Sequence, residues 1–72
     1  MIPLPKMYAT IAYIDRNTRW DDVEFYVSQK YSNSSEIWSY VKHVCKSAEK
    51  NSVRLLDITV FDGEKEIWNW KA

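Results

Sequence analysis

The stretch from Asn33 to Lys50 places the tightest constraint on the fold of this chain. Its apolar side chains recur at the i, i+3, i+4, i+7 and i+8 spacing of one helical face. They are Ile37, Tyr40, Val41, Val44, Cys45 and Ala48. Asn33 and Glu36 resemble a capping box, and Asn51 is a candidate left-handed stop. The pattern predicts one amphipathic helix, in which Cys45 is a small core residue.

Segments rich in β-branched and aromatic residues lie on both sides of this helix. Lys6–Ile14 is apolar on both faces, which is typical of a central strand. Arg19–Tyr31 alternates, which is typical of a half-solvated strand. Its two faces carry Val23, Phe25 and Val27 on one side and Asp22, Glu24, Tyr26 and Ser28 on the other. Val53–Asp62 and Glu64–Lys71 are the third and fourth predicted strands.

The predicted element order is β-β-α-β-β, which is an α+β fold. A right-handed crossover through the helix leaves room for the first strand between the second and the third. We therefore expect a four-stranded antiparallel sheet of order 2-1-3-4, with the helix on one face and the other face open to solvent or a partner. Residues 1–72 form a single domain, and the prolines within residues 1–5 predict an extended lead-in.

The sequence does not determine the register of the C-terminal hairpin. Asp62 and Gly63 are a strong hairpin signal. A two-residue loop there leaves Trp68 and Trp70 on the face opposite Ile58, whereas a three-residue loop puts both tryptophans beside Ile58. We expect the two tryptophans to be partly buried.

Composition limits the classes of function. Ten basic and ten acidic residues give a formal net charge of zero, whereas a dedicated duplex binder normally carries a basic excess. No apolar run approaches the roughly 18 residues of a membrane span, and the first residues do not read as a signal peptide. A single free cysteine suggests the cytoplasm. A core this small depends on its aromatic residues or on a second copy, so a homodimer is possible.

Residues with catalytic or metal-binding chemistry do not assemble into a recognisable site. His43 and Cys45 are two positions apart on a helix, so they point in different directions and cannot form a nucleophile–base pair. Asp21, Asp22 and Glu24 fit a solvated strand edge better than a metal site. We expect no enzymatic activity, no cofactor and no metal.

Two features favour binding instead. Lys42, Lys46 and Lys50 form an i, i+4, i+8 row on the exposed face of the helix. The chain also has more aromatic side chains than one helix and four short strands easily bury, and an exposed aromatic cluster marks a contact surface. The candidate partner-binding residues are Trp68, Trp70, Tyr26, Glu24, Asp22, Lys42, Lys46 and Lys50.

The segments KMYATIAYI at residues 6–14, VEFYV at 23–27 and VRLLDITV at 53–60 surround the polar-capped helix in the order β-β-α-β. This layout resembles small bacteriophage proteins that inhibit host machinery, of the RNA-polymerase-inhibitor and anti-CRISPR types. The chain departs from the polymerase inhibitors, which carry arginines in the third strand where this chain has Asp57 and Thr59. The resemblance implies a non-catalytic protein that occupies a surface of a host protein in the host cytoplasm, and it carries over no functional residue.

Two functions of different classes remain in competition. The leading hypothesis is a protein-binding module, an inhibitor or adaptor, that presents the open sheet face or an edge strand with tryptophans and Tyr26 as anchors. The alternative is a single-stranded nucleic-acid-binding domain that stacks bases on Tyr8, Tyr13 or Tyr26 while the lysine row follows the phosphates. Neutral net charge makes nucleic acid the less favoured partner.

Overall fold

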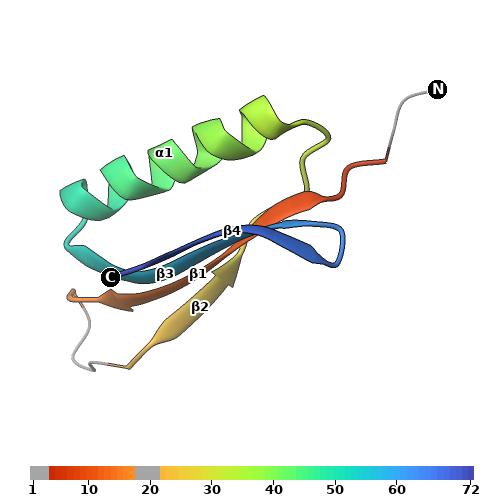
Figure 1. Ribbon diagram of the computed structural model, residues 1–72. Coiled ribbons are helices and arrows are strands. Elements are labelled where there is room, and N and C mark those ends of the chain that lie inside the picture. The colour runs from red at the N-terminus through yellow and green to blue at the C-terminus, as the bar shows by residue number, and fades with distance from the viewer. Residues whose placement is uncertain (1–3, 18–21) are drawn as a thin grey trace.

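The computed structural model describes residues 4–17 and 22–72, and it has two layers, one helix on one four-stranded antiparallel sheet (Figure 1). The elements are β1 (Met7–Asp15), β2 (Glu24–Val27), α1 (Ser34–Lys50), β3 (Val53–Asp62) and β4 (Lys65–Lys71). The sheet order is β2-β1-β3-β4, so the expected α+β fold and strand order are confirmed. Residues 1–3 of the expected lead-in and Asp21 of the acidic cluster lie outside the described residues.

Side-chain hydrogen bonds fix both ends of α1. Asn33 Oδ1 accepts the backbone N–H of Glu36 at 3.0 Å, which is the predicted N-cap. Asn51 closes the other end, where its Nδ2 donates to the carbonyl oxygen of Ser47 at 2.7 Å. The expectation of a left-handed Asn51 is wrong, because Asn51 has φ −108° and the left-handed residue is Ser52 with φ 56°.

The core lies between the helix and the two central strands. Its buried cluster consists of Ala9, Ile11, Ile37, Val41, Ile58 and Val60. The prediction that Cys45 is a core residue is wrong, because the thiol is exposed. Cys45 follows Val41 by four residues, or about 40° around the helix axis, so it lies on the flank of the line through the buried Val41 and Ala48.

Within the described residues, strand β2 covers only 24–27 of the expected segment 19–31, and residues 19–21 of that segment lie outside the described residues. Beyond Val27, the N–H of Ser28 still donates to the Ala9 carbonyl at 2.9 Å. In the reverse direction, however, the Ala9 N–H donates to the hydroxyl of Ser28, also at 2.9 Å. The side chain thus replaces a backbone acceptor and ends the regular ladder. Pairing resumes only at the isolated bridge between Met7 and Tyr31.

The apolar side chains of β2 lie on the face of the sheet that α1 does not cover. Tyr26 pairs with Ile11, which is part of the core, so Tyr26 is on the helix side. Phe25 and Val27 therefore point to the opposite, open side, where they are 78% and 60% exposed. The solvated face of this strand is the apolar one.

A β-bulge settles the hairpin register. Asp62 pairs with Lys65, so the hairpin loop consists of Gly63 and Glu64 instead of Asp62 and Gly63. A register shift between Val60 and Phe61 then places Trp68 opposite Val60. The tryptophans consequently share the helix side, as a three-residue loop would have arranged. Trp68 is half-buried and Trp70 is 39% exposed, so the expected partial burial applies to Trp68.

Candidate functional site

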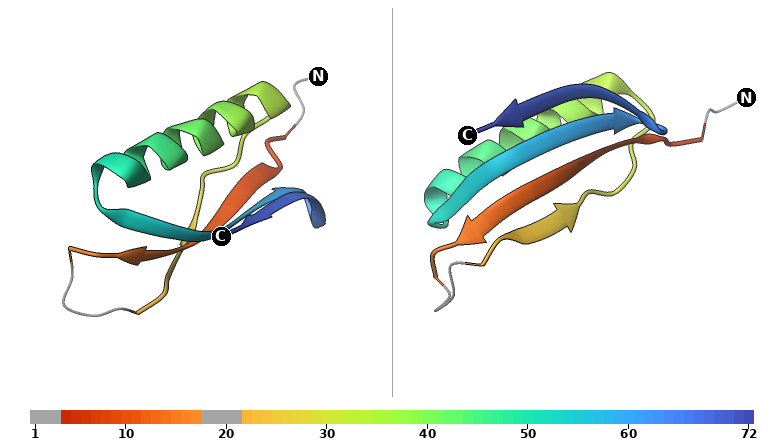
Figure 2. Two further views of the ribbon diagram at one scale, coloured as in Figure 1. Left: turned by 60° about the vertical axis from the view of Figure 1, so that its left-hand side comes forward. Right: turned by 60° about the horizontal axis from the view of Figure 1, so that its bottom comes forward.

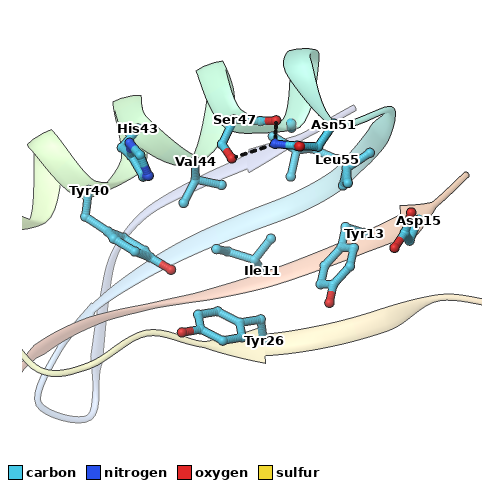
Figure 3. Close-up of a pocket in the computed structure, with 12 residues that line it drawn as sticks. Ile11, Tyr13, Asp15, Tyr26, Tyr40, His43, Val44, Ser47, Asn51 and Leu55 are labelled. Atoms are coloured by element: carbon cyan, nitrogen blue, oxygen red, sulfur yellow. Dashed lines mark hydrogen bonds between the residues drawn. The ribbon is translucent and has the colours of Figure 1, made fainter. Parts of the chain in front are cut away.

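A groove of about 440 Å³ runs between α1 and the β2–β1 half of the sheet (Figure 3). The helix α1 contacts β1 and β3, so it does not cover the inner side of β2. The residues that shape the groove include Tyr13, Tyr26, Tyr40, His43, Val44 and Leu55. Figure 3 shows Tyr40 reaching from α1 toward the sheet, with Tyr13 and Tyr26 on the strands below it. Three phenol rings from separate elements therefore surround one opening.

The environment of the groove favours the neutral form of two of its phenols, Tyr40 and Tyr13. Burial, and then the neighbouring rings of Tyr26 and Tyr31, raise the pKa of Tyr40 to about 12. Burial, followed by the carboxylate of Glu24 on the paired strand, raises the pKa of Tyr13. Neutral phenols donate and accept hydrogen bonds while their rings supply apolar area. The groove therefore suits an uncharged or cationic side chain better than an anion.

The open face of the sheet is apolar next to β2. The rings of Tyr8 on β1 and Phe61 on β3 stack on this face, with centroids 5.1 Å apart and an interplanar angle of 17°. Phe25 and Val27 lie on the same face at the edge of the sheet, opposite Ala12 and Thr10 of β1. Figure 2 shows that no element of the described chain covers this face. An exposed cluster of aromatic and aliphatic side chains is typical of a contact surface.

The β4 side of the open face is polar instead. Asn69 Nδ2 donates to Asp57 Oδ1 at 3.0 Å and to Thr59 Oγ1 at 2.8 Å. The hydroxyl of Thr59 in turn donates to Asp57 Oδ1 at 2.9 Å. These side chains satisfy one another, whereas the exposed Phe25 and Val27 on this face belong to β2.

The backbone of β2 also faces outward at the same residues. The N–H of Ser28 points to β1, where it bonds Ala9. Successive residues of an antiparallel strand direct their backbone groups to alternate edges, so those of Tyr26 point to β1 and those of Phe25 and Val27 point away from the sheet. Among the described residues, no strand lies beyond β2. We call the outward backbone and exposed side chains of residues 24–27 the β2 edge.

The structure distributes the eight predicted partner-binding residues over three surfaces. Asp22, Glu24 and Tyr26 lie at or next to β2, and all three are exposed. Trp68 and Trp70 are on β4, at the other edge of the sheet. Trp68 packs edge-on against Trp38, with ring centroids 5.4 Å apart. The predicted anchors therefore belong to the two edge strands and do not meet on the open face.

The predicted lysine row forms the third surface. Lys42, Lys46 and Lys50 are exposed, and helical geometry places them opposite the buried line through Val41 and Ala48. They consequently face away from both the groove and the sheet aromatics. The alternative function requires lysines and stacking rings on one surface, and this arrangement separates them.

Sequence reasoning missed Phe25, Val27, Tyr40 and His43 as candidate site residues. The alternation of β2 was visible, but it does not tell which face meets the helix. Tyr40 fits the apolar helical face and thus reads as core, although it also borders the groove. His43 is exposed at the groove rim.

No family model, curated protein sequence or solved structure matches this chain. Within residues 4–17 and 22–72, no three His, Cys, Asp or Glu side chains gather into a group that could hold a metal ion. The described helix lacks the length and apolar character needed to cross a membrane.

Proposed function

We propose that this chain is a non-enzymatic protein-binding module that binds an extended segment of a partner protein along the β2 edge. One observation carries the proposal. Phe25 is 78% exposed on an edge strand, on the side of the sheet that α1 does not cover, at a position whose backbone groups face outward. Apolar contact area and main-chain hydrogen-bonding groups thus coincide at one residue, as strand addition requires.

A strand added to β2 would contact both the groove and the open face, which lie on the two sides of β2. Neighbouring strands are about 4.8 Å apart, and their side chains alternate between the two faces. A segment paired with β2 would place one set of side chains beside Phe25 and Val27. It would direct the other set toward Tyr26, Tyr40 and the groove. Both surfaces then contribute to binding, while backbone bonds set the register.

Charge indicates the chemistry of the segment. Asp22 and Glu24 lie at one end of β2, and the groove there is bordered by Asp15. A residue opposite Glu24 shares its face of the sheet, where opposite charges stabilise a cross-strand pair. The segment we propose therefore has apolar residues opposite Phe25 and Val27 and a lysine or arginine opposite Glu24. Occupying another protein in this way is the mode of action of an inhibitor or adaptor, and we propose a host protein as the target, following the resemblance to phage inhibitors.

Selection from a displayed library of random peptides against the purified chain tests the proposal. We expect the recovered peptides to alternate apolar and basic residues. Phe25→Ser should weaken their binding at least tenfold, because the residue lies at the centre of the interface. Leu4→Ser is the matched control, since Leu4 is also strongly exposed but lies outside the sheet.

Equal binding to wild type and to the Phe25→Ser variant contradicts the proposal. Circular dichroism must first show that the variant keeps its fold, which we expect because Phe25 is strongly exposed and lies on the side of the sheet away from the buried core cluster. A selection that yields only peptides lost on Lys46→Ala would move the site to the helix.

A further inference from the structure

Strand β4 forms the other edge of the sheet. We propose that a second copy of this chain binds along this edge. The two β4 strands would pair antiparallel about a two-fold axis at Asn69 and join two four-stranded sheets into one. This proposal is independent of the proposed function, which uses the opposite edge. It rests on the backbone phase, the tryptophans and the charges of β4.

The backbone phase of β4 follows from one hydrogen bond. The N–H of Ala72 donates to the carbonyl oxygen of Leu56 at 2.9 Å, so residue 72 directs its backbone toward β3. By alternation, Trp70 and Trp68 also direct theirs toward β3, whereas Asn69 and Lys71 direct theirs outward. A two-fold axis at Asn69 brings two outward-facing backbones together in phase. The same axis keeps both helices on one side of the joined sheet.

The tryptophans complement each other in this pairing. Trp70 of one copy lies directly opposite Trp68 of the second copy, and both are on the helix side. Within each copy, Trp68 already packs edge-on against Trp38, with an interplanar angle of 88°. The added strand extends this pair to Trp70, which is 39% exposed in the single chain. Aromatic pairs across strands stabilise a sheet beyond their buried area.

The charged side chains of β4 favour an axis at Asn69 over an axis one residue away, at Trp68. An axis at Trp68 would set Lys71 directly opposite Lys65 of the second copy, which is unfavourable. An axis at Asn69 sets Lys71 opposite Ile67, next to Glu66 of the second copy. Lys71 and Glu66 share the open side, because they pair with Asp57 and Phe61. Because of the two-fold symmetry, the attraction between Lys71 and Glu66 occurs twice. The zero net charge adds no general repulsion between the copies.

The length of the edge supports the same assignment. Strand β4 has seven residues, compared with four in β2. Ile67 and Trp70 expose about two-fifths of their surface along it, at 40% and 39%. A long edge strand that exposes apolar residues and that no other described element covers is a template for another strand. The copy that matches its phase and charge is β4 itself.

Light scattering coupled to size-exclusion chromatography of the full chain tests the pairing. We expect wild type to have twice the mass of one chain. Glu66→Lys and Lys71→Glu should each weaken association at least tenfold, because each places like charges together across the axis. An equimolar mixture of the two variants should recover the double mass, since the mixed pair restores both attractions. Recovery on mixing also shows that neither variant has lost its fold.

Three results would overturn the pairing. The first is a wild type that remains a single chain at millimolar concentration. The second is a mixture of Glu66→Lys and Lys71→Glu that fails to associate. The third is loss of the dimer on Phe25→Ser with no effect of Lys71→Pro, which removes an outward N–H of β4. That last outcome would assign self-association to β2. If Phe25→Ser leaves the dimer intact, self-association is separate from the peptide binding that the same variant tests.

Discussion

The hydroxyl of Ser28 accepts the backbone N–H of Ala9 at 2.9 Å, in the place where a regular ladder has a carbonyl oxygen. The same hydroxyl donates to the carbonyl of Gln29 at 2.8 Å. Ser28 is buried, and Ala9 belongs to the core cluster. This pair ends β2 and thereby limits the β2 edge to four residues.

Replacing Ser28 by alanine should therefore lower the stability of the fold. The variant leaves the buried N–H of Ala9 without its acceptor, which costs roughly 1–3 kcal/mol in free energy of unfolding. Urea denaturation followed by circular dichroism measures the loss. Ser32→Ala is the control, because Ser32 is exposed. A Ser28→Ala curve that coincides with the control would contradict the role given to this hydroxyl.

The two tryptophans of β4 should differ in their contribution to the single chain. Trp68 is half-buried against Trp38, so Trp68→Ala should destabilise the chain by roughly 2–3 kcal/mol, somewhat below the range for a fully buried aromatic side chain. Trp70→Ala should cost less than about 1 kcal/mol at concentrations where copies do not associate. Denaturation of both variants at low micromolar concentration checks the order. Equal losses would place the two side chains in equivalent surroundings, contrary to the structure.

Alkaline pH should lower the stability of the fold through Tyr40. The folded state raises the pKa of this phenol from 10.0 to about 12, so the neutral form is favoured in the fold. The resulting stabilisation is complete below pH 10 and is lost as the pH rises through about 12. Tyr40→Phe should show a smaller loss of stability across that window, measured by urea denaturation at fixed pH values. Identical pH profiles for both proteins would contradict the assignment.

Single-stranded nucleic acid should not bind at physiological ionic strength. The lysine row through Lys46 faces away from the sheet, so no base stacked on Tyr8 or Tyr26 would bring its phosphates near these charges. Fluorescence anisotropy of labelled oligonucleotides across a salt titration is the measurement. A steep salt-dependent affinity that falls with Lys46→Ala would favour the alternative function over the proposed one.

Local sequence patterns predicted the helix and the strands of this fold. Strand pairing and a β-bulge determine which face of the sheet each side chain occupies. The apolar spacing and Asn33 were enough to place the helix, and the topology rule was enough to order the strands. The faces of β2 and β4 were not predictable in the same way. A bulge beside Val60 reverses the side of Trp68, and the choice of inner face in β2 depends on its pairing with β1. Neither has a local sequence signal.

The candidate site was predictable only in part for the same reason. Tyr26 and Glu24 were identified because aromatic and acidic residues stand out in a short strand. In the sequence, Phe25 and Val27 fit the inner face of an amphipathic strand. The structure instead places them on the open side of the sheet. The groove depends on how far α1 extends over the sheet, which no pattern within the helix specifies.

Hydrogen exchange at single backbone amides, followed by NMR with and without a selected peptide, tests the central claim most directly. We expect the outward amides of Phe25 and Val27 to exchange quickly in the free protein and to become protected when peptide is bound. The amide of Tyr26, which points to β1, should be protected in both states. Protection that appears on other strands while Phe25 and Val27 remain fast would contradict binding along the β2 edge.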